Sequence, residues 1–176
     1  HVAGTIAQST NNNYGVAGVA YQAKIMPIKV LGTGGGTVAD IAEGIRFAAD
    51  NGAQVINMSL GGGGESKLME EAINYAYDKG VVMIAAAGNA NQNASSYPAR
   101  YPKVIGVSAL DAAGNKAEYS NFGAGVDIAA PGGGKEDKIL QNTIDPQTGK
   151  SVFMGYQGTS MAAPHVAGVA AMLKSV

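Results

Sequence analysis

Short apolar runs recur along this chain and predict the strands of a sheet. They lie at Lys24–Leu31, Gln54–Leu60, Val81–Ala87, Val104–Leu110 and Val126–Ala130, and most are rich in valine, isoleucine or alanine. The run Val81–Ala87 is apolar throughout, which is typical of a strand that is buried on both faces.

Segments with helical spacing of apolar residues lie between or after these strands. Isoleucine and alanine recur at helical intervals in Val38–Asn51, which stops at Gly52. A second helix is predicted between the N-cap Ser66 and Gly80, and a third, built of small residues, over Thr159–Ser175. Alternating strands and helices predict a parallel sheet with helices on both sides, in three layers.

The ends of the predicted strands are followed by the least regular sequences. In open parallel sheets, ligands bind beyond the carboxyl ends of the strands. Here those ends are followed by Gly32–Gly36, Ser59–Gly64, Ala87–Asn89 and Pro131–Gly134, so we expect a binding site among them. The polar, glycine-rich segment Gly132–Lys150 is expected to be a surface loop.

Length and composition narrow the range of functions. The 176 residues suit one domain or part of a larger one. Twelve Lys and Arg residues against thirteen Asp and Glu residues give a net charge of −1, which argues against nucleic acid or a membrane as a partner. The absence of cysteine excludes disulfides, thiolate metal sites and a cysteine nucleophile.

The most specific motif surrounds Ser160. The sequence GTSMAAPHVAG at residues 158–168 places this serine in the first turn of the third predicted helix. Free backbone N–H groups and the helix dipole favour a developing negative charge at that position. The small residues that follow allow the helix to lie close against a sheet, so the motif indicates more than a helix cap.

This undecapeptide resembles the nucleophile motif of subtilisin-like serine proteases. Three further segments resemble motifs of the same family, in the family's order: the histidine motif at His1–Thr5, the substrate-pocket strand at Asn57–Gly62, and the oxyanion-hole segment at Ala86–Asn89. The resemblance covers essentially the whole chain. It implies the family's α/β fold, with a mostly parallel sheet flanked by helices. It also implies hydrolysis of peptide or protein substrates through an acyl-enzyme, without a catalytic cofactor.

The resemblance assigns roles to matching positions of this chain. Ser160 matches the nucleophile, and Asn89 matches the side-chain donor to the oxyanion. Substrate binding is assigned to an edge segment and to two walls of the pocket for the residue before the cut bond. These are Gly34, Gly35 and Gly36 at the edge, Ser59, Leu60 and Gly61 in one wall, and Ala86, Ala87 and Gly88 in the other.

The family's catalytic aspartate and catalytic histidine have no match in this chain. His1 matches the second, non-catalytic histidine of the histidine motif, and His165 matches a structural histidine of the nucleophile helix. We therefore expect residues 1–176 to be the C-terminal portion of a catalytic domain that is incomplete at its N-terminus, with a gap in its sheet and almost no activity alone. The expected partners are the N-terminal part of the domain, on the same chain or on a companion chain, and a prodomain.

A structural calcium ion is a further implication of the resemblance. The sequence TNNNYGV at residues 10–16 resembles the family's calcium loop, with oxygen donors expected from Thr10, Asn12, Tyr14 and Val16. The alternative is an asparagine-rich turn without a metal. A second cation site is implied at the carbonyl groups of Ala99, Tyr101 and Val104, and the Tyr97–Pro98 peptide bond is expected to be cis.

Two other functions fit parts of the sequence. The strand, glycine turn and helix over residues 24–51 could hold a dinucleotide, but the glycine spacing is GxGGG rather than GxGxxG. A catalytically incomplete, peptide-binding pseudoprotease would share the fold, although both Ser160 and Asn89 are intact. Secretion is expected because most proteins of the family that this chain resembles are secreted.

Overall fold

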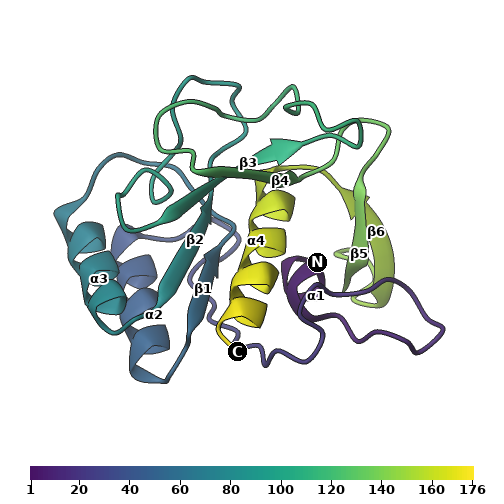
Figure 1. Cartoon of the computed structure of the whole chain (residues 1–176), viewed down its shortest axis with the longest axis horizontal. Coiled ribbons are helices and arrows are strands. Elements are labelled where there is room, and N and C mark those ends of the chain that lie inside the picture. The colour runs from purple at the N-terminus through teal and green to yellow at the C-terminus, as the bar shows by residue number, and fades with distance from the viewer.

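Four parallel strands form the central sheet of the computed structural model, which describes all 176 residues (Figure 1). In spatial order they are β1 (Val55–Met58), β2 (Val82–Ala86), β3 (Ile105–Leu110) and β4 (Ile128–Pro131). The first three lie within strands predicted from the sequence, and β4 extends one residue beyond its prediction. The parallel sheet that the alternation of strands and helices predicts is therefore confirmed.

Helices cover both faces of this sheet. They are α2 (Val38–Asp50) and α3 (Lys67–Asp78) on one face, and α4 (Thr159–Leu173) on the other. In β2, Met83 and Ala85 belong to the core under α2 and α3, whereas Ile84 and Ala86 belong to the core under α4. Ile84 has no exposed surface, and burial of such a side chain contributes about 1.5–3 kcal/mol. None of the helices is both long and apolar enough to span a membrane.

The ends of α2 follow from local sequence. Thr37 and Asp40 form a capping box, in which the Thr37 hydroxyl accepts from the Asp40 N–H at 3.1 Å and the Asp40 carboxylate accepts from the Thr37 N–H at 3.2 Å. Beyond the helix, Gly52 takes a φ of +81°, which glycine adopts without strain. At the start of α3, Ser66 is the N-cap as predicted, but its side chain makes no cap bond.

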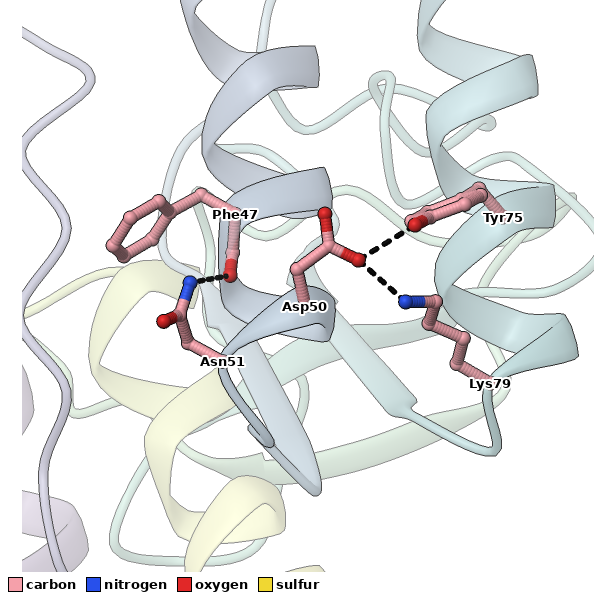
Figure 2. A network of polar contacts seen from close by, with 5 residues as sticks. All are labelled: Phe47, Asp50, Asn51, Tyr75 and Lys79. Carbon is pink, nitrogen blue, oxygen red and sulfur yellow. Dashed lines mark hydrogen bonds and ion pairs between the residues drawn. The ribbon is translucent and has the colours of Figure 1, made fainter.

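An exposed polar cluster joins the C-terminal ends of α2 and α3 (Figure 2). Asp50 accepts hydrogen bonds from the Tyr75 hydroxyl at 2.6 Å and from the Lys79 ammonium. The bond from Lys79, followed by the bond from Tyr75, lowers the pKa of the Asp50 carboxyl. Because solvent screens this cluster, it contributes little to the free energy of unfolding.

The strand predicted over Lys24–Leu31 is wrong. This segment pairs with no strand, and no backbone–backbone hydrogen bond joins it to the rest of the chain. It lies against α2, where a Cβ added to Gly44 would be 2.6 Å from Cγ1 of Val30. A strand needs a neighbouring backbone, and none is present here. β1 is an edge strand of the sheet, and its outer edge is unpaired.

The surface loop predicted over Gly132–Lys150 is wrong in its second half. There, β5 (Ile139–Ile144) pairs with β6 (Ser151–Tyr156) in an antiparallel hairpin. The short helix α1 (Val2–Ala7) packs against β5, and Gln141 of this strand is only 2% exposed. The sequence did not predict β5 because its polar residues indicate a surface loop. In the structure one of them, Gln141, is buried under α1 instead of facing solvent.

Candidate active site

Ser160 lies in the first turn of α4, next to the end of β1. Its hydroxyl donates to the carbonyl of Ser59 at 3.3 Å, and the Ser59 hydroxyl donates to the carbonyl of Ser160 at 2.8 Å. Since Ser59 directly follows β1, this pair places Ser160 at the carboxyl edge of the sheet, where ligands bind in such folds. Backbone N–H groups in the first turn have no acceptor within the helix.

The Asn89 side chain is held in one orientation by Thr159, the residue before Ser160. Its Oδ1 accepts two hydrogen bonds from Thr159, one from the N–H and one from the hydroxyl, both at 2.9 Å. The Thr159 hydroxyl in turn accepts from the Gly88 N–H at 3.1 Å. Because both bonds from Thr159, the residue before Ser160, end on Oδ1 of Asn89, Nδ2 of Asn89 is left as a donor.

Asn121 supports the loop that carries Asn89, although no motif in the sequence marks it. Its side chain is 1% exposed, its Oδ1 accepts from the N–H groups of Ala90 at 2.9 Å and Gln92 at 3.1 Å, and its Nδ2 donates to the carbonyl of Ala87 at 3.0 Å. These three bonds bracket Asn89 on both sides. In the sequence, the pair Ser120-Asn121 indicates only a turn and gives no sign of this supporting role.

The two predicted walls of the pocket lie next to each other. β1 and β2 are parallel neighbours with Met58 opposite Ala85, so the segments that follow them leave the sheet side by side. A Cβ added to Gly61 would be 3.9 Å from the carbonyl oxygen of Ala86. The residues Ala86 and Ala87 are only 4% and 0% exposed, whereas Gly88 is partly exposed, so Gly88 is the part of that wall that a substrate can reach.

No hydrogen bond joins the predicted edge segment Gly34–Gly36 to Ser160 or to the pocket walls. The segment belongs to an exposed turn in which the Gly32 N–H donates to the Gly35 carbonyl at 2.8 Å. A Cβ added to Gly34 or Gly35 would have no atom within 4 Å. The backbone of the turn is therefore accessible, but its neighbours in the structure do not fix its position relative to Ser160.

Neither histidine is placed to accept a proton from Ser160. Nε2 of His1 lies 3.0 Å from the carbonyl oxygen of Ile139 and 3.1 Å from that of Met154. Nδ1 of His165 lies 2.8 Å from the carbonyl oxygen of Met161, within α4. Burial lowers the pKa of the His165 imidazole, and its hydrogen bond with Met161 acts in the opposite direction.

The residues predicted to bind calcium form an exposed turn. Oδ1 of Asn12 accepts from the Tyr14 N–H at 3.1 Å, which makes an Asx turn. The structure contains no group of three or more histidine or acidic side chains that could hold a metal. A cation at this turn would therefore rest on Asn12 Oδ1 and on backbone carbonyls.

The second predicted cation site lies in a turn before β3. Its Tyr101 carbonyl already accepts from the Val104 N–H at 3.0 Å. The Tyr97–Pro98 peptide bond at the start of this region is cis, as the resemblance implies.

Known proteins resemble this chain along its whole length. The sequence profile of the subtilase family, Peptidase_S8, matches residues 1–176. An extracellular protease of Xanthomonas campestris pv. campestris is 49% identical, over 100% of this chain and 32% of that protein. Subtilisin Savinase of Lederbergia lenta is 46% identical, over 99% of this chain and 61% of that protein. Thermitase of Thermoactinomyces vulgaris is 45% identical, over 99% of this chain and 60% of that protein.

A solved structure agrees with these sequences. It is a protease from Pseudoalteromonas arctica, with a TM-score of 0.94 and 44% identity, and the match covers 99% of this chain and 57% of that one. The chain thus spans between 32% and 61% of the length of these relatives. The family profile, the relatives and the fold agree, and the chain belongs to the subtilase family.

Proposed function

We propose that this chain is the nucleophile-bearing part of a serine endopeptidase that hydrolyses peptide bonds. Oγ of Ser160 attacks the carbonyl carbon of the cut bond. Its proton passes to a histidine outside residues 1–176, which then protonates the leaving amine. Water hydrolyses the resulting acyl-enzyme and regenerates the serine.

The fixed orientation of the Asn89 amide is the observation that carries this proposal. Thr159, the residue before Ser160, occupies Oδ1 of Asn89 with two hydrogen bonds, which leaves Nδ2 of Asn89 as a donor. The Ser160 N–H, in the first turn of α4, is the second donor. Preorganised donors of this kind stabilise the oxyanion of a tetrahedral intermediate.

Unpaired groups in Lys24–Leu31 and β1 support a need for more protein. Lys24–Leu31 and the outer edge of β1 lack a partner, and Oδ1 of Asn57 in β1 is buried without a donor. An added strand would satisfy such groups. We infer that the N-terminal part of the domain, on the same chain or a companion chain, is the required partner. Because triad members act as a unit, residues 1–176 alone should be nearly inactive.

Fluorophosphonate labelling, read by intact mass, tests this function. The reagent forms a bond to an activated serine oxygen with loss of fluoride. We expect almost no adduct on the purified 17.7 kDa chain. We expect one adduct, located on Ser160, once the remainder of the domain is present.

Two variants make this labelling specific. Ser160→Ala should abolish the adduct, whereas Ser175→Ala, which changes an exposed serine at the end of α4, should retain it. Strong peptidase activity from the 17.7 kDa chain alone would show that no external histidine is needed. An unlabelled Ser160 in the complete domain would contradict the peptidase function itself and favour a peptide-binding pseudoprotease.

We also propose that the turn containing Thr10, Asn12, Tyr14 and Val16 contributes to a structural calcium site. These residues offer four oxygen atoms, and calcium takes six to eight, so water or the rest of the domain must supply others. Calcium at about 100 times its Kd would stabilise the complete domain by roughly 2.7 kcal/mol. A second cation site at the carbonyl groups of Ala99, Tyr101 and Val104 stays a separate prediction.

Thermal melting measures the calcium effect. Millimolar calcium should raise the Tm of the complete domain, and magnesium, which prefers a rigid octahedral site, should not. Asn12→Ala should remove the increase, while Asn12→Asp, which keeps the oxygen, should preserve it. An equal Tm in calcium and in chelator would reject a site at this turn.

Secretion is proposed from similarity, since one close relative is named an extracellular protease. Fractionation of the producing cells tests it, and a protein confined to the cell pellet would contradict it.

A further inference from the structure

A hollow of about 520 Å³ lies beside the turn that carries Ser160. It is lined by Lys135, Lys138, Gly155, Tyr156, Gln157 and Met161. Gln157 and Met161 flank residues 158–160 in the sequence, so the hollow directly borders the nucleophile turn. None of its lining residues belongs to the two predicted pocket walls.

The hairpin places Lys138 in this hollow. Ile139 lies opposite Tyr156 in the β5–β6 pairing, so Lys138 is next to Gln157. The stem of Lys138 extends over Gly155, where an added Cβ would lie 2.9 Å from Cβ of the lysine. The absence of a side chain at Gly155 thus leaves room for the lysine against β6.

The charge that lines the hollow is positive. Lys138 has no carboxylate within 4.0 Å, whereas Lys135 pairs with exposed Glu118 at 3.1 Å. Glu136 and Asp137 lie between the two lysines in the sequence, but no acidic residue lines the hollow. Lys138 therefore carries the ammonium group that is free to meet an incoming carboxylate.

The hollow lies on the other side of α4 from the predicted pocket walls. Figure 1 shows the β5–β6 hairpin on one side of α4 and strands β1 and β2 on the other. Ser59 and Asn89 contact residues 159 and 160 from the β1–β2 side. If the residue before the cut bond occupies that side, the residues after the cut bond pass Met161 and reach the hollow.

We propose that this hollow selects substrates with an acidic side chain within two residues after the cut bond. The inference rests on the proposed peptidase function and adds the substrate class. A carboxylate there meets the Lys138 ammonium and the positive end of the α4 dipole. An exposed pair of this kind gives about a three- to fivefold preference, carried mainly by electrostatic complementarity.

Matched peptides measure this preference in the complete domain. Quenched fluorescent peptides share one acyl portion and carry Glu or Gln at the first or second position after the cut bond. We expect kcat/KM to be about three- to fivefold higher for Glu at low salt. The ratio should fall towards one in 1 M salt, where the screening length is only about 3 Å.

Variants that each remove one lysine test which positive charge causes the preference for Glu. Lys138→Gln should bring the Glu-to-Gln ratio close to one, and Lys135→Gln should reduce it less, because Glu118 already pairs with that lysine. Lys150→Gln removes the same charge at the turn of the hairpin, outside the hollow, and should leave the ratio unchanged. A ratio of one in the unmodified protein, or an equal loss in Lys138→Gln and Lys150→Gln, would overturn the proposal.

A p-nitroanilide substrate separates this inference from the peptidase function, because it has no residue after the cut bond. Hydrolysis of that substrate together with a Glu-to-Gln ratio of one rejects only the hollow's role. If no substrate is hydrolysed, the hollow is tested on the isotope-labelled chain by NMR titration with acetyl-Glu-amide and acetyl-Gln-amide. Shifts at Gly155 and Gln157 with the Glu compound alone, lost in Lys138→Gln, support the role, and equal shifts with both compounds reject it.

Discussion

Replacing Asn89 with Leu should lower kcat of the complete enzyme about 100- to 1,000-fold, with little change in KM. Loss of a side-chain oxyanion donor in subtilisin, a member of the same family, costs this much, so the magnitude is taken from that relative. The physical reason lies in the two Thr159 bonds to Oδ1, which fix Nδ2 as a donor before the substrate arrives. Leucine has a similar size and no donor.

The neighbouring residue Gln92 provides the control for this variant. It belongs to the same loop, it is exposed, and its side chain makes no hydrogen bond, so Gln92→Leu should leave kcat unchanged. Steady-state kinetics on one substrate compare the two variants. An Asn89→Leu enzyme with normal kcat would mean that the amide stabilises only the turn, and a raised KM with normal kcat would place its effect in substrate binding.

Replacing Asn121 with Ala should lower the free energy of unfolding by about 2–4 kcal/mol, because buried backbone groups lose a hydrogen-bond partner. Three hydrogen bonds disappear, and the N–H groups of Ala90 and Gln92 and the carbonyl of Ala87 lose this partner. For a protein of this size, the loss corresponds to a Tm lower by roughly 5–15 °C. Because these bonds also position the loop around Asn89, kcat should fall in the same variant.

Asn142→Ala is the matched control for Asn121→Ala. The Asn142 side chain donates one exposed hydrogen bond, to the Ser151 hydroxyl at 2.8 Å, so its loss should change Tm by no more than a few degrees. Calorimetry on both variants measures the difference. Equal melting temperatures for Asn121→Ala and the unmodified protein would show that water replaces the lost bonds and that the loop does not depend on Asn121.

The sheet and its helices could be predicted from the sequence because their signals are local. Val81–Ala87 is apolar throughout, and the strand β2 that it forms is buried on both faces. Gly52 and Gly80 mark the ends of α2 and α3, and both take positive φ. The same reasoning fails for Lys24–Leu31, since the residues that favour a strand do not reveal whether a neighbouring strand exists to pair with it.

The residues of the candidate site could be predicted from the sequence only where they belong to a recognisable motif. Ser160 and Asn89 come from recognisable segments, and the structure brings them together through Thr159. Asn121 was missed because its importance depends on contacts 29 to 34 positions away in the chain, which no local pattern encodes. Lys138 was missed because a polar sequence hides the strand β5 that it precedes.

Helix α4 contacts all four strands of the sheet as well as α1, so the support of Ser160 is spread over most of the molecule. A substitution that shifts this helix therefore disturbs the core in many places at once. The exposed turn at Gly34–Gly36 and the lysines of the hollow have no such coupling. Substitutions at these peripheral residues should therefore alter the choice of peptide with little loss of stability, whereas substitutions that move α4 should impair folding and activity together.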